Sequence, residues 1–230
     1  AAHVNTVEQS ISNPNILCAG SATGGAWKTI DKGDNWNLIT QNLFLNGVYA
    51  IEIDFSNPDI IYIDGGYEGI YKSYDGGVNW TVIGDSAFTS LSHWIRDIKL
   101  NPNNNQILFV ASSQGLFKSI DGGSNFTTVT TGVIPNSISP GNFQEIEFHP
   151  NSSDTMYFIK EGNPKTEFYR SDDGGNTLTL YNNGWPNPAS GDEQLRTEIA
   201  VSPASPNKIV ALATGSANGG SGLYGIYISD

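Results

Sequence analysis

The sequence predicts an all-β protein built from repeated sheets of four short strands, and three observations support this prediction. The chain holds 26 glycines and 11 prolines among 230 residues. Their combined share exceeds the roughly 12% that these two residues make up in an average chain. Charged residues make up only 15%, too few to cover the exposed faces of many long helices. Two sequence motifs also return about every 45 residues, a spacing typical of repeated four-stranded sheets.

The first repeated motif is a Ser/Thr-x-Asp segment followed by a glycine-containing turn, which we call the Asp turn. Its aspartates are spaced by 44, 46 and 52 residues: Asp31, Asp75, Asp121 and Asp173. An aromatic residue follows the first three turns: Trp36, Trp80 and Phe126. Leu178 takes this place in the fourth copy, and residues 226–230 match the start of a fifth. The motif therefore marks five repeats.

The second motif is a proline turn between two apolar segments, and it keeps the same period. Its prolines are Pro14, Pro58, Pro102, Pro150 and Pro203. One repeat then consists of strand A, the proline turn, strand B, a variable loop, strand C, the Asp turn and strand D. Four antiparallel strands of this length form one blade of a β-propeller, and neighbouring blades bury each other's faces.

The repeat spacing predicts a single propeller with four complete blades and a fifth partial one. The expected blade limits are 7–46, 47–92, 93–139, 140–190 and an incomplete 191–230. Because the fifth copy of the Asp turn is cut short, we expect further blades of a longer chain, or a second chain, to complete the ring.

The repeats resemble the Asp-box family, also called BNR repeats, whose consensus is Ser/Thr-x-Asp-x-Gly-x-x-Trp/Phe. Three copies match it in full, and the resemblance covers nearly the whole chain. The family includes sialidases, xyloglucanase-like glycosidases, sortilin-type receptors and secreted bacterial surface proteins. Phrases such as residues 56–62, Ser-Asn-Pro-Asp-Ile-Ile-Tyr, look most like secreted proteins of Bacteroidetes. The resemblance implies a propeller that is secreted or lies at the cell surface.

The aspartates of the Asp turns are expected to be structural. An aspartate in a tight turn accepts hydrogen bonds from nearby backbone N–H groups. In the Asp-box family, these turns lie on the face opposite the ligand site. A calcium site is the alternative, but the spacing lacks the alternating acids and distal glutamate of a calcium loop. No metal site and no cofactor is predicted.

One acid per repeat recurs in strand A when the proline turns are aligned with allowance for one extra residue. These acids are Glu8, Glu52, Asp97, Glu145 and Glu198. Strand A is the innermost strand of a propeller blade, so the five carboxylates are expected to ring the central channel. They would form a cation site or an acidic entrance, or else lie along solvated strand edges. Close carboxylates should share protons or bind a cation.

Catalytic patterns of the resembling enzymes are not found. Sialidases hold their substrate with three arginines, and this chain has only Arg96, Arg170 and Arg196, of which Arg170 occupies the basic position before an Asp turn. In xyloglucanase-like glycosidases a catalytic aspartate stands five residues before the aromatic of the first strand C. Ala22 has that place in the first repeat, and Gly66 has it in the second.

Binding residues are expected in the variable loops, which carry function on rigid scaffolds. The candidates are Trp94, Trp185, Tyr67 and His93. Each aromatic residue could stack on a sugar or instead wedge between blades. The predicted function is therefore a non-catalytic binding or scaffold propeller of an exported bacterial cell-surface protein, with a glycan or a protein as partner. Part of a glycoside hydrolase is the alternative, and a receptor-like peptide binder is the third.

The charge and hydropathy of the chain exclude other partners. The net charge is −12, from 11 basic and 23 acidic residues. Binding to nucleic acids requires a basic surface that neutralises phosphates, so no nucleic acid partner is expected. No apolar run reaches the roughly 18 residues that would suggest a membrane span. We therefore expect no direct insertion into a membrane.

Overall fold

The computed structural model describes residues 3–45, 47–88, 94–129, 141–162, 164–181, 183–185, 187–217 and 220–229. The chain divides into two compact units. The first unit consists of Ala1–Val110 and Phe117–Thr127, and the second of Ala111–Leu116 and Thr128–Asp230. Each unit contains hydrophobic clusters of its own.

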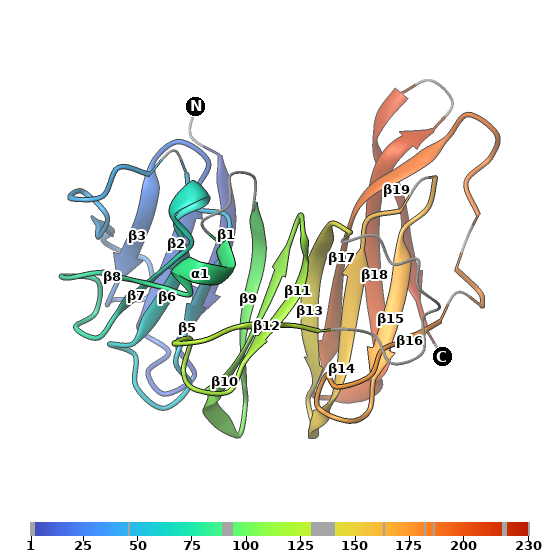
Figure 1. Cartoon of the computed structure of the whole chain (residues 1–230). Coiled ribbons are helices and arrows are strands. Elements are labelled where there is room, and N and C mark those ends of the chain that lie inside the picture. The colour runs from blue at the N-terminus through green and yellow to red at the C-terminus, as the bar shows by residue number, and fades with distance from the viewer. Residues whose placement is uncertain are drawn as a thin grey trace. The chain divides into compact units, whose positions relative to one another are not determined.

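The fold is an all-β propeller of five blades, as the sequence predicts (Figure 1). Among the described residues, four sheets have four strands and the fifth has three. The first sheet contains β1 (Val4–Gln9), β2 (Leu17–Ser21), β3 (Gly25–Thr29) and β4 (Asn37–Leu38). The second contains β5 (Ile51–Ile53), β6 (Ile61–Asp64), β7 (Ile70–Ser73) and β8 (Thr81–Ile83). The third contains β9 (Ile95–Asn101), β10 (Asn104–Ser112), β11 (Gly115–Ser119) and β12 (Thr127–Thr128).

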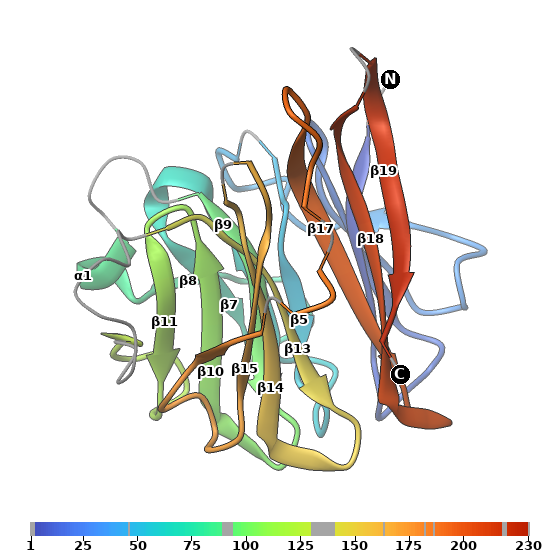
Figure 2. The ribbon, with the colours of Figure 1, turned by 90° about the vertical axis from the view of Figure 1, so that its right-hand side faces the viewer.

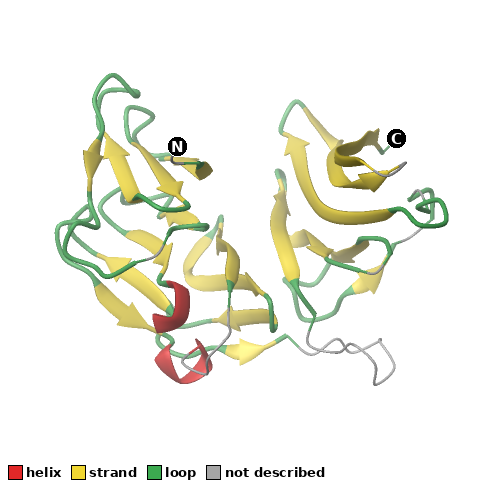
Figure 3. Cartoon of the chain, turned by 90° about the horizontal axis from the view of Figure 1, so that it is seen from above, coloured by secondary structure: helices red, strands yellow, loops and turns green. Residues whose placement is uncertain are grey.

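The remaining strands form the fourth and fifth sheets. The fourth contains β13 (Phe143–His149), β14 (Ser152–Lys160), β15 (Glu167–Ser171) and β16 (Thr179–Leu180). The fifth contains β17 (Glu193–Ser202), β18 (Ser205–Ala217) and β19 (Gly220–Ile228), which run side by side in Figure 2. In the part of the chain that the structure describes, helix is limited to η1 (Gly66–Glu68) and α1 (Asp85–Phe88), drawn red in Figure 3.

The sheets of the first unit pack through alternating side chains. The side chains on one face of the second sheet point toward the first sheet, where Ile51, Ile61 and Tyr71 join a cluster with Cys18. The side chains on its other face point toward the third sheet and include Tyr62 and Ile70. Because successive side chains of a strand point to opposite faces, a strand buried on both faces does not alternate between apolar and polar residues. This explains the continuous apolar run 60–63 in and before β6.

The Asp turns are closed by hydrogen bonds to the aspartate carboxylate. In the second sheet, Asp75 Oδ1 accepts the backbone N–H of Asn79 at 2.8 Å, and its Oδ2 accepts the Asn79 side-chain amide at 2.7 Å. Ser73 Oγ accepts the Gly77 N–H at 2.8 Å and donates to Asp75 at 2.9 Å. The same set recurs at Asp31 and Asp121. These carboxylates are thus used by their own turns.

The fourth Asp turn has a threonine where the others have asparagine. Thr177 donates its N–H to Asp173 Oδ1 at 2.8 Å and its hydroxyl to Oδ2 at 2.7 Å. A hydroxyl thus replaces the amide as second donor. Leu178 has taken the place of the aromatic and is fully buried.

The lysine before each of the first two Ser/Thr-x-Asp segments joins neighbouring sheets. Lys28 Nζ in β3 donates to the carbonyl of Gly76 in the next sheet at 3.1 Å. Lys72 Nζ in β7 donates to the carbonyl of Gly122 in the following sheet at 3.0 Å. A charged donor satisfies a turn carbonyl that the turn itself leaves unbonded. The basic position thus stabilises the packing of one blade on the next.

The aromatic residue after the Asp turn also reaches the preceding sheet. Trp80 Nε1 donates to the carbonyl of Ile39 in the first sheet at 2.9 Å, and its ring packs on the cluster shared by the two sheets. Gly77 is required here because its φ is 95° and an added Cβ would lie 2.9 Å from the Ile39 side chain. In the first sheet, Trp36 instead donates to its own turn at Gly33 and stays 37% exposed.

Candidate binding site

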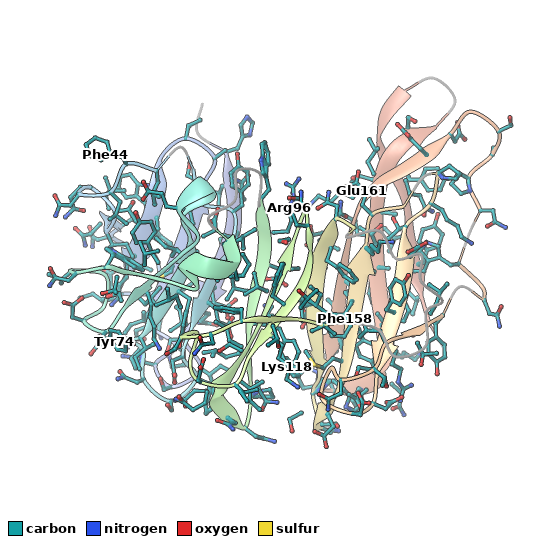
Figure 4. The ribbon with its side chains drawn as sticks, viewed as in Figure 1. Phe44, Tyr74, Arg96, Lys118, Phe158 and Glu161 are labelled. Carbon is teal, nitrogen blue, oxygen red and sulfur yellow. The ribbon has the colours of Figure 1, made fainter. Side chains whose placement is uncertain are left out.

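A cavity of about 260 Å³ lies in the first unit, at the strand ends opposite the Asp turns. It is lined by the connection from the first to the second sheet, by the loop between β6 and β7, and by the start of β9. Figure 4 shows Phe44 and Arg96 toward one end of the strands of this unit and Tyr74, in the second Asp turn, toward the other. The lining side chains with polar or aromatic groups are Phe44, Tyr49, Asp64, Glu68, Trp94 and Arg96.

Asp64 forms the buried acidic wall of this cavity. It is 2% exposed, and its Oδ1 accepts the backbone N–H groups of Tyr49 at 2.6 Å and Ala50 at 3.0 Å. Burial raises the pKa of Asp64 to about 7, while the hydrogen bonds from Ala50 and Tyr49 and the charge of Arg96 act in the opposite direction. The carboxyl therefore fixes the connection between the first two sheets and titrates near neutral pH.

Another part of the cavity lining combines an aromatic ring with a guanidinium. Trp94 is 50% exposed, and the Arg96 guanidinium carbon lies 5.3 Å from the centre of its ring. A cation over an indole face is attracted to the electrons of the ring. Phe44 is fully exposed at the rim. The cavity thus offers an aromatic surface beside charged groups.

Glu68 brings a second carboxylate to the cavity from η1. Its Oε2 accepts a hydrogen bond from the Tyr71 hydroxyl. Burial, together with the hydrogen bond to Glu68 and its negative charge, raises the pKa of Tyr71 to about 12. Tyr71 therefore stays a neutral donor and positions the Glu68 carboxylate.

The rim residues predicted from the sequence have separate places. Trp94 lines the cavity. Tyr67 lies in η1 between the lining residues Gly66 and Glu68, and His93 lies outside the described residues. Trp185 belongs to the second unit, where its ring lies between Phe168 at 6.1 Å and Tyr227 at 5.9 Å. Trp185 thus wedges between the fourth and fifth sheets, the alternative that the sequence left open.

The predicted column of strand A acids occupies more than one strand position. One residue of strand B serves as a common reference point in each sheet: it pairs with the strand C residue that stands just before the Ser/Thr of the Asp turn. The reference residues are Cys18, Tyr62, Tyr157 and Val210. Glu8 faces Cys18, and Glu52 faces Tyr62. Tyr157, however, faces Glu147, and Val210 faces Ala200. Glu145 and Glu198 therefore lie two residues away from the position of Glu8 and Glu52.

The proline turn explains this correction to the alignment. In four sheets seven residues lie between the regularly paired parts of strand A and strand B: 10–16, 54–60, 149–155 and 202–208. In the last two sheets this segment also contains one further pair after a register shift, His149 with Ser152 and Ser202 with Ser205. Proline is the fifth of these residues in the first two sheets and the second in the last two. Proline suits either place because both lie in a turn and need no ladder N–H. The prolines are therefore not equivalent positions.

In the first unit, the acids of the innermost strands meet a lysine. Lys99 Nζ lies 3.9 Å from Glu8 Oε2, and the Leu100 N–H donates to Glu52 Oε1 at 2.9 Å. Burial raises the pKa of Glu52 well above its ordinary value, Lys99 lowers it, and Glu8 and Asp97 raise it. In the second unit, Arg196 bonds Glu198 at 2.5 Å. Basic side chains thus balance acids that the sequence assigned to a shared acidic ring.

The sequence did not single out Phe44, Asp64 or Arg96 as parts of a binding site. Asp64 follows directly on the apolar run 60–63, so an acid at the end of a buried strand B was the available signal. Arg96 was considered only as part of an arginine triad. Among the described residues, no three His, Cys, Asp or Glu side chains come together as metal ligands, and no helix is long and apolar enough to cross a membrane.

Three solved structures of GH74 enzymes have a similar fold and are much longer than this chain. An ancestral GH74 enzyme has a TM-score of 0.69 at 20% identity, with 93% of this chain and 28% of that chain covered. The GH74 enzyme of Niastella koreensis has 0.66 at 22% identity, with coverage of 93% and 33%. The GH74 xyloglucanase from Xanthomonas campestris has 0.67 at 15% identity, with coverage of 93% and 36%. At these identities the likeness concerns the fold alone.

The chain spans between 28% and 36% of the length of these enzymes. No curated protein matches it. The model of the Sortilin-Vps10 family, described as sortilin, neurotensin receptor 3, matches residues 68–211, which is more than half of the sequence. Because this match runs through the repeats that form the blades, the chain belongs to the Sortilin-Vps10 family of β-propeller proteins.

Proposed function

We propose that this chain is a non-catalytic, glycan-binding propeller of the Asp-box type, and that the glycan binds in the cavity beside Trp94. The observation that carries the proposal is the composition of the cavity. An exposed indole in contact with the Arg96 guanidinium stands beside the carboxylates of Asp64 and Glu68. Recognition sites of this kind combine an apolar surface with a few placed polar groups.

A sugar ring fits this combination because it has an apolar face of C–H groups and a rim of hydroxyls. The Trp94 ring supplies a flat apolar surface. Aromatic side chains suit this task because they bury a large apolar area while one end stays in contact with water. Glu68 accepts hydrogen bonds from hydroxyls, and Arg96 donates to them. The cavity volume of about 260 Å³ suits the end of a glycan more than a long stretch of it.

A position at the bacterial cell surface is part of the same proposal. It is supported by the resemblance of the repeats to secreted bacterial proteins and by the acidic composition, with a net charge of −12. Labelling of intact cells of the source organism with an antibody against the chain should detect it. Detection only after cell lysis would contradict this location.

The test of the binding function measures affinity for soluble glycans by isothermal titration calorimetry. Xyloglucan oligosaccharides are the first probe, because one structurally similar protein is a xyloglucanase. We expect the Trp94→Ala variant to bind at least tenfold more weakly. The matched control is Trp36→Ala, which removes another exposed indole at the Asp-turn end and should leave binding unchanged. Equal losses in both variants, or none in either, would contradict the proposed site.

Hydrolysis of a glycoside is a second candidate function, supported by one observation. Asp64 and Glu68 line the same cavity, and burial raises the pKa of Asp64 to about 7, as a general acid requires. Against it, Asp64 is almost fully buried and its Oδ1 holds two backbone N–H groups. Release of reducing sugar by the wild type, abolished in both Asp64→Asn and Glu68→Gln, would favour the enzyme over the binder.

A further inference from the structure

The charged groups in the cavity beside Trp94 do not balance. Its described lining residues supply two carboxylates, Asp64 and Glu68, and one guanidinium, Arg96. Burial raises the pKa of Asp64, and the positive charge of Arg96 is among the effects that lower it, so these two charges act on each other. The Arg96 guanidinium also lies 5.3 Å from the centre of the Trp94 ring. Arg96 is therefore engaged by an acid and a ring, and the Glu68 carboxylate is left in excess.

The Glu68 carboxylate is positioned to meet a ligand. Glu68 is exposed in η1, and its Oε2 accepts a hydrogen bond from the Tyr71 hydroxyl. Tyr71 belongs to β7 and is buried, so the donor is fixed by the packing of the sheet. A carboxylate can accept about four hydrogen bonds on its two oxygens, so the bond from Tyr71 leaves Glu68 able to accept others.

The aromatic part of the lining attracts positive charge as well. Phe44, Tyr49 and Trp94 all line the cavity, and all three are exposed. The face of an aromatic ring is negative and attracts a cation, and tryptophan does so most strongly. The net charge of −12 gives the surroundings the same sign. A ligand group that carries a positive charge therefore fits the cavity better than a neutral or a negative one.

We propose that the glycan bound beside Trp94 carries a free amino group, as oligosaccharides of glucosamine do, and that its ammonium pairs with the Glu68 carboxylate. The inference rests on the proposed glycan-binding function and names the class of glycan. The face of the sugar ring lies on Trp94, as in any glycan. An N-acetylated sugar has the same face but no charge, and an acidic sugar would be repelled by Glu68. The site thus selects for the amine.

The first test compares three ligands on the wild-type protein by isothermal titration calorimetry at pH 6, where the sugar amine is protonated. The ligands are the tetramer of glucosamine, the tetramer of N-acetylglucosamine and a xyloglucan oligosaccharide. A salt concentration of about 0.15 M screens attraction between distant charges. We expect the glucosamine tetramer to bind at least tenfold more tightly than the other two, because hydrogen bonds between charged groups are stronger than neutral ones.

A matched pair of protein variants assigns this preference to one carboxylate. Glu68→Gln keeps the shape of the side chain and an oxygen for the Tyr71 hydroxyl, and it should remove the preference for the amine. Asp34→Asn removes the same charge from an exposed position in the first Asp turn and should keep the preference. Equal melting temperatures establish that both variants fold. If both lose the preference equally, the net charge attracts the amine, and the proposal is wrong.

Further outcomes separate this inference from the proposed function. If the amino and N-acetyl tetramers bind equally, and Trp94→Ala weakens both, the glycan site stands and the selection for an amine is refuted. If no oligosaccharide binds, both proposals fail. A tetralysine peptide carries the same charge without a sugar ring. If it binds as tightly as the glucosamine tetramer and depends equally on Glu68, the site recognises an ammonium alone, which would overturn the assignment to an amino sugar.

Discussion

At the scale of single residues, the buried polar groups of the first unit have defined structural tasks. Asp64 holds the N–H groups of Tyr49 and Ala50, and Lys72 holds the carbonyl of Gly122 in the next sheet. A buried group of this kind is tolerated because it satisfies a backbone partner that would otherwise be orphaned. These residues therefore connect the local chain to the packing of the blades.

Asp64 should make the protein less stable as the pH rises through neutrality. Its folded-state pKa is raised to about 7 from an ordinary value near 4, so between these values the folded state binds more protons than the unfolded state. The stabilisation by this group is fully present below about pH 4 and is lost as the pH rises to 7. The Asp64→Asn variant should lose much of the difference between the urea midpoints at pH 5 and pH 8. An unchanged difference would contradict the raised pKa.

Removing the charged donor of Lys72 should destabilise the first unit. Lys72 is nearly buried, and its ammonium lies 4.8 Å from the centre of the Tyr62 ring and 3.0 Å from the Gly122 carbonyl. Lys72→Met keeps the aliphatic stem but leaves the carbonyl unsatisfied, at a cost of about 2 kcal/mol in the free energy of unfolding. Lys32→Met, at an exposed site in the first Asp turn, is the control and should change stability little. Urea denaturation measures both.

At the scale of elements, the Asp turn is a unit with three functions. Its carboxylate closes the turn, its glycine allows the close approach to the preceding sheet, and its aromatic residue packs between sheets. In the first sheet these functions occur separately. Trp36 donates to the Gly33 carbonyl of its own turn and stays partly exposed, while the hydrogen bonds to the Asp31 carboxylate are still formed. The turn therefore forms without the insertion of its aromatic ring.

This separation predicts different costs for two tryptophans in the same motif position. Trp80→Ala should lower the free energy of unfolding by about 3–5 kcal/mol, because it leaves a cavity between two sheets and an unbonded Ile39 carbonyl. Trp36→Ala should cost less than about 1 kcal/mol, since the ring is partly in solvent. Chemical denaturation of the two variants checks the contrast. Similar losses would show that the ring acts through the turn and not through the sheet contact.

The turn carboxylates should contribute to stability at moderately low pH. Hydrogen bonds from Asn79 hold the pKa of Asp75 at about 2, and those from Thr29 and Asn35 do the same for Asp31. A lowered folded-state pKa gives stability that is present above the ordinary value near 4 and is lost as the pH falls to 2. Asp75→Asn should therefore lose less stability than the wild type between pH 4 and pH 2. A parallel loss in both proteins would contradict the lowered pKa.

At the scale of the whole molecule, the composition sets which partners are excluded. The net charge of −12 makes the surface repel phosphate backbones. We therefore expect no binding to a fluorescent single-stranded DNA or RNA oligonucleotide at 0.1 M salt, measured by anisotropy. Binding that weakens with salt would reveal a local basic surface that the net charge conceals.

The fold could be predicted from the sequence, because it depends on short-range patterns that repeat. The spacing of Asp31, Asp75, Asp121 and Asp173 indicated the blades, and the apolar strands indicated burial on both faces. The candidate site could be predicted only in part. Trp94 was identified as a loop aromatic with Arg96 two residues after it, whereas Asp64 and Glu68 come from the preceding repeat and meet Trp94 only after packing. No local pattern in the sequence reports that meeting.

The sequence by itself determined the repeat, the antiparallel strands and the chemistry of the Asp turn, since each depends on residues close together in the chain. The tertiary structure alone decided which acids share a strand position and which residues enclose a cavity. A proline fits two places of the seven-residue segment between the regular ladders, so only the pairing of the strands could set the register of Glu145 and Glu198. Likewise, Trp36 and Trp80 occupy the same motif position, and only the neighbouring sheet decides which ring is inserted.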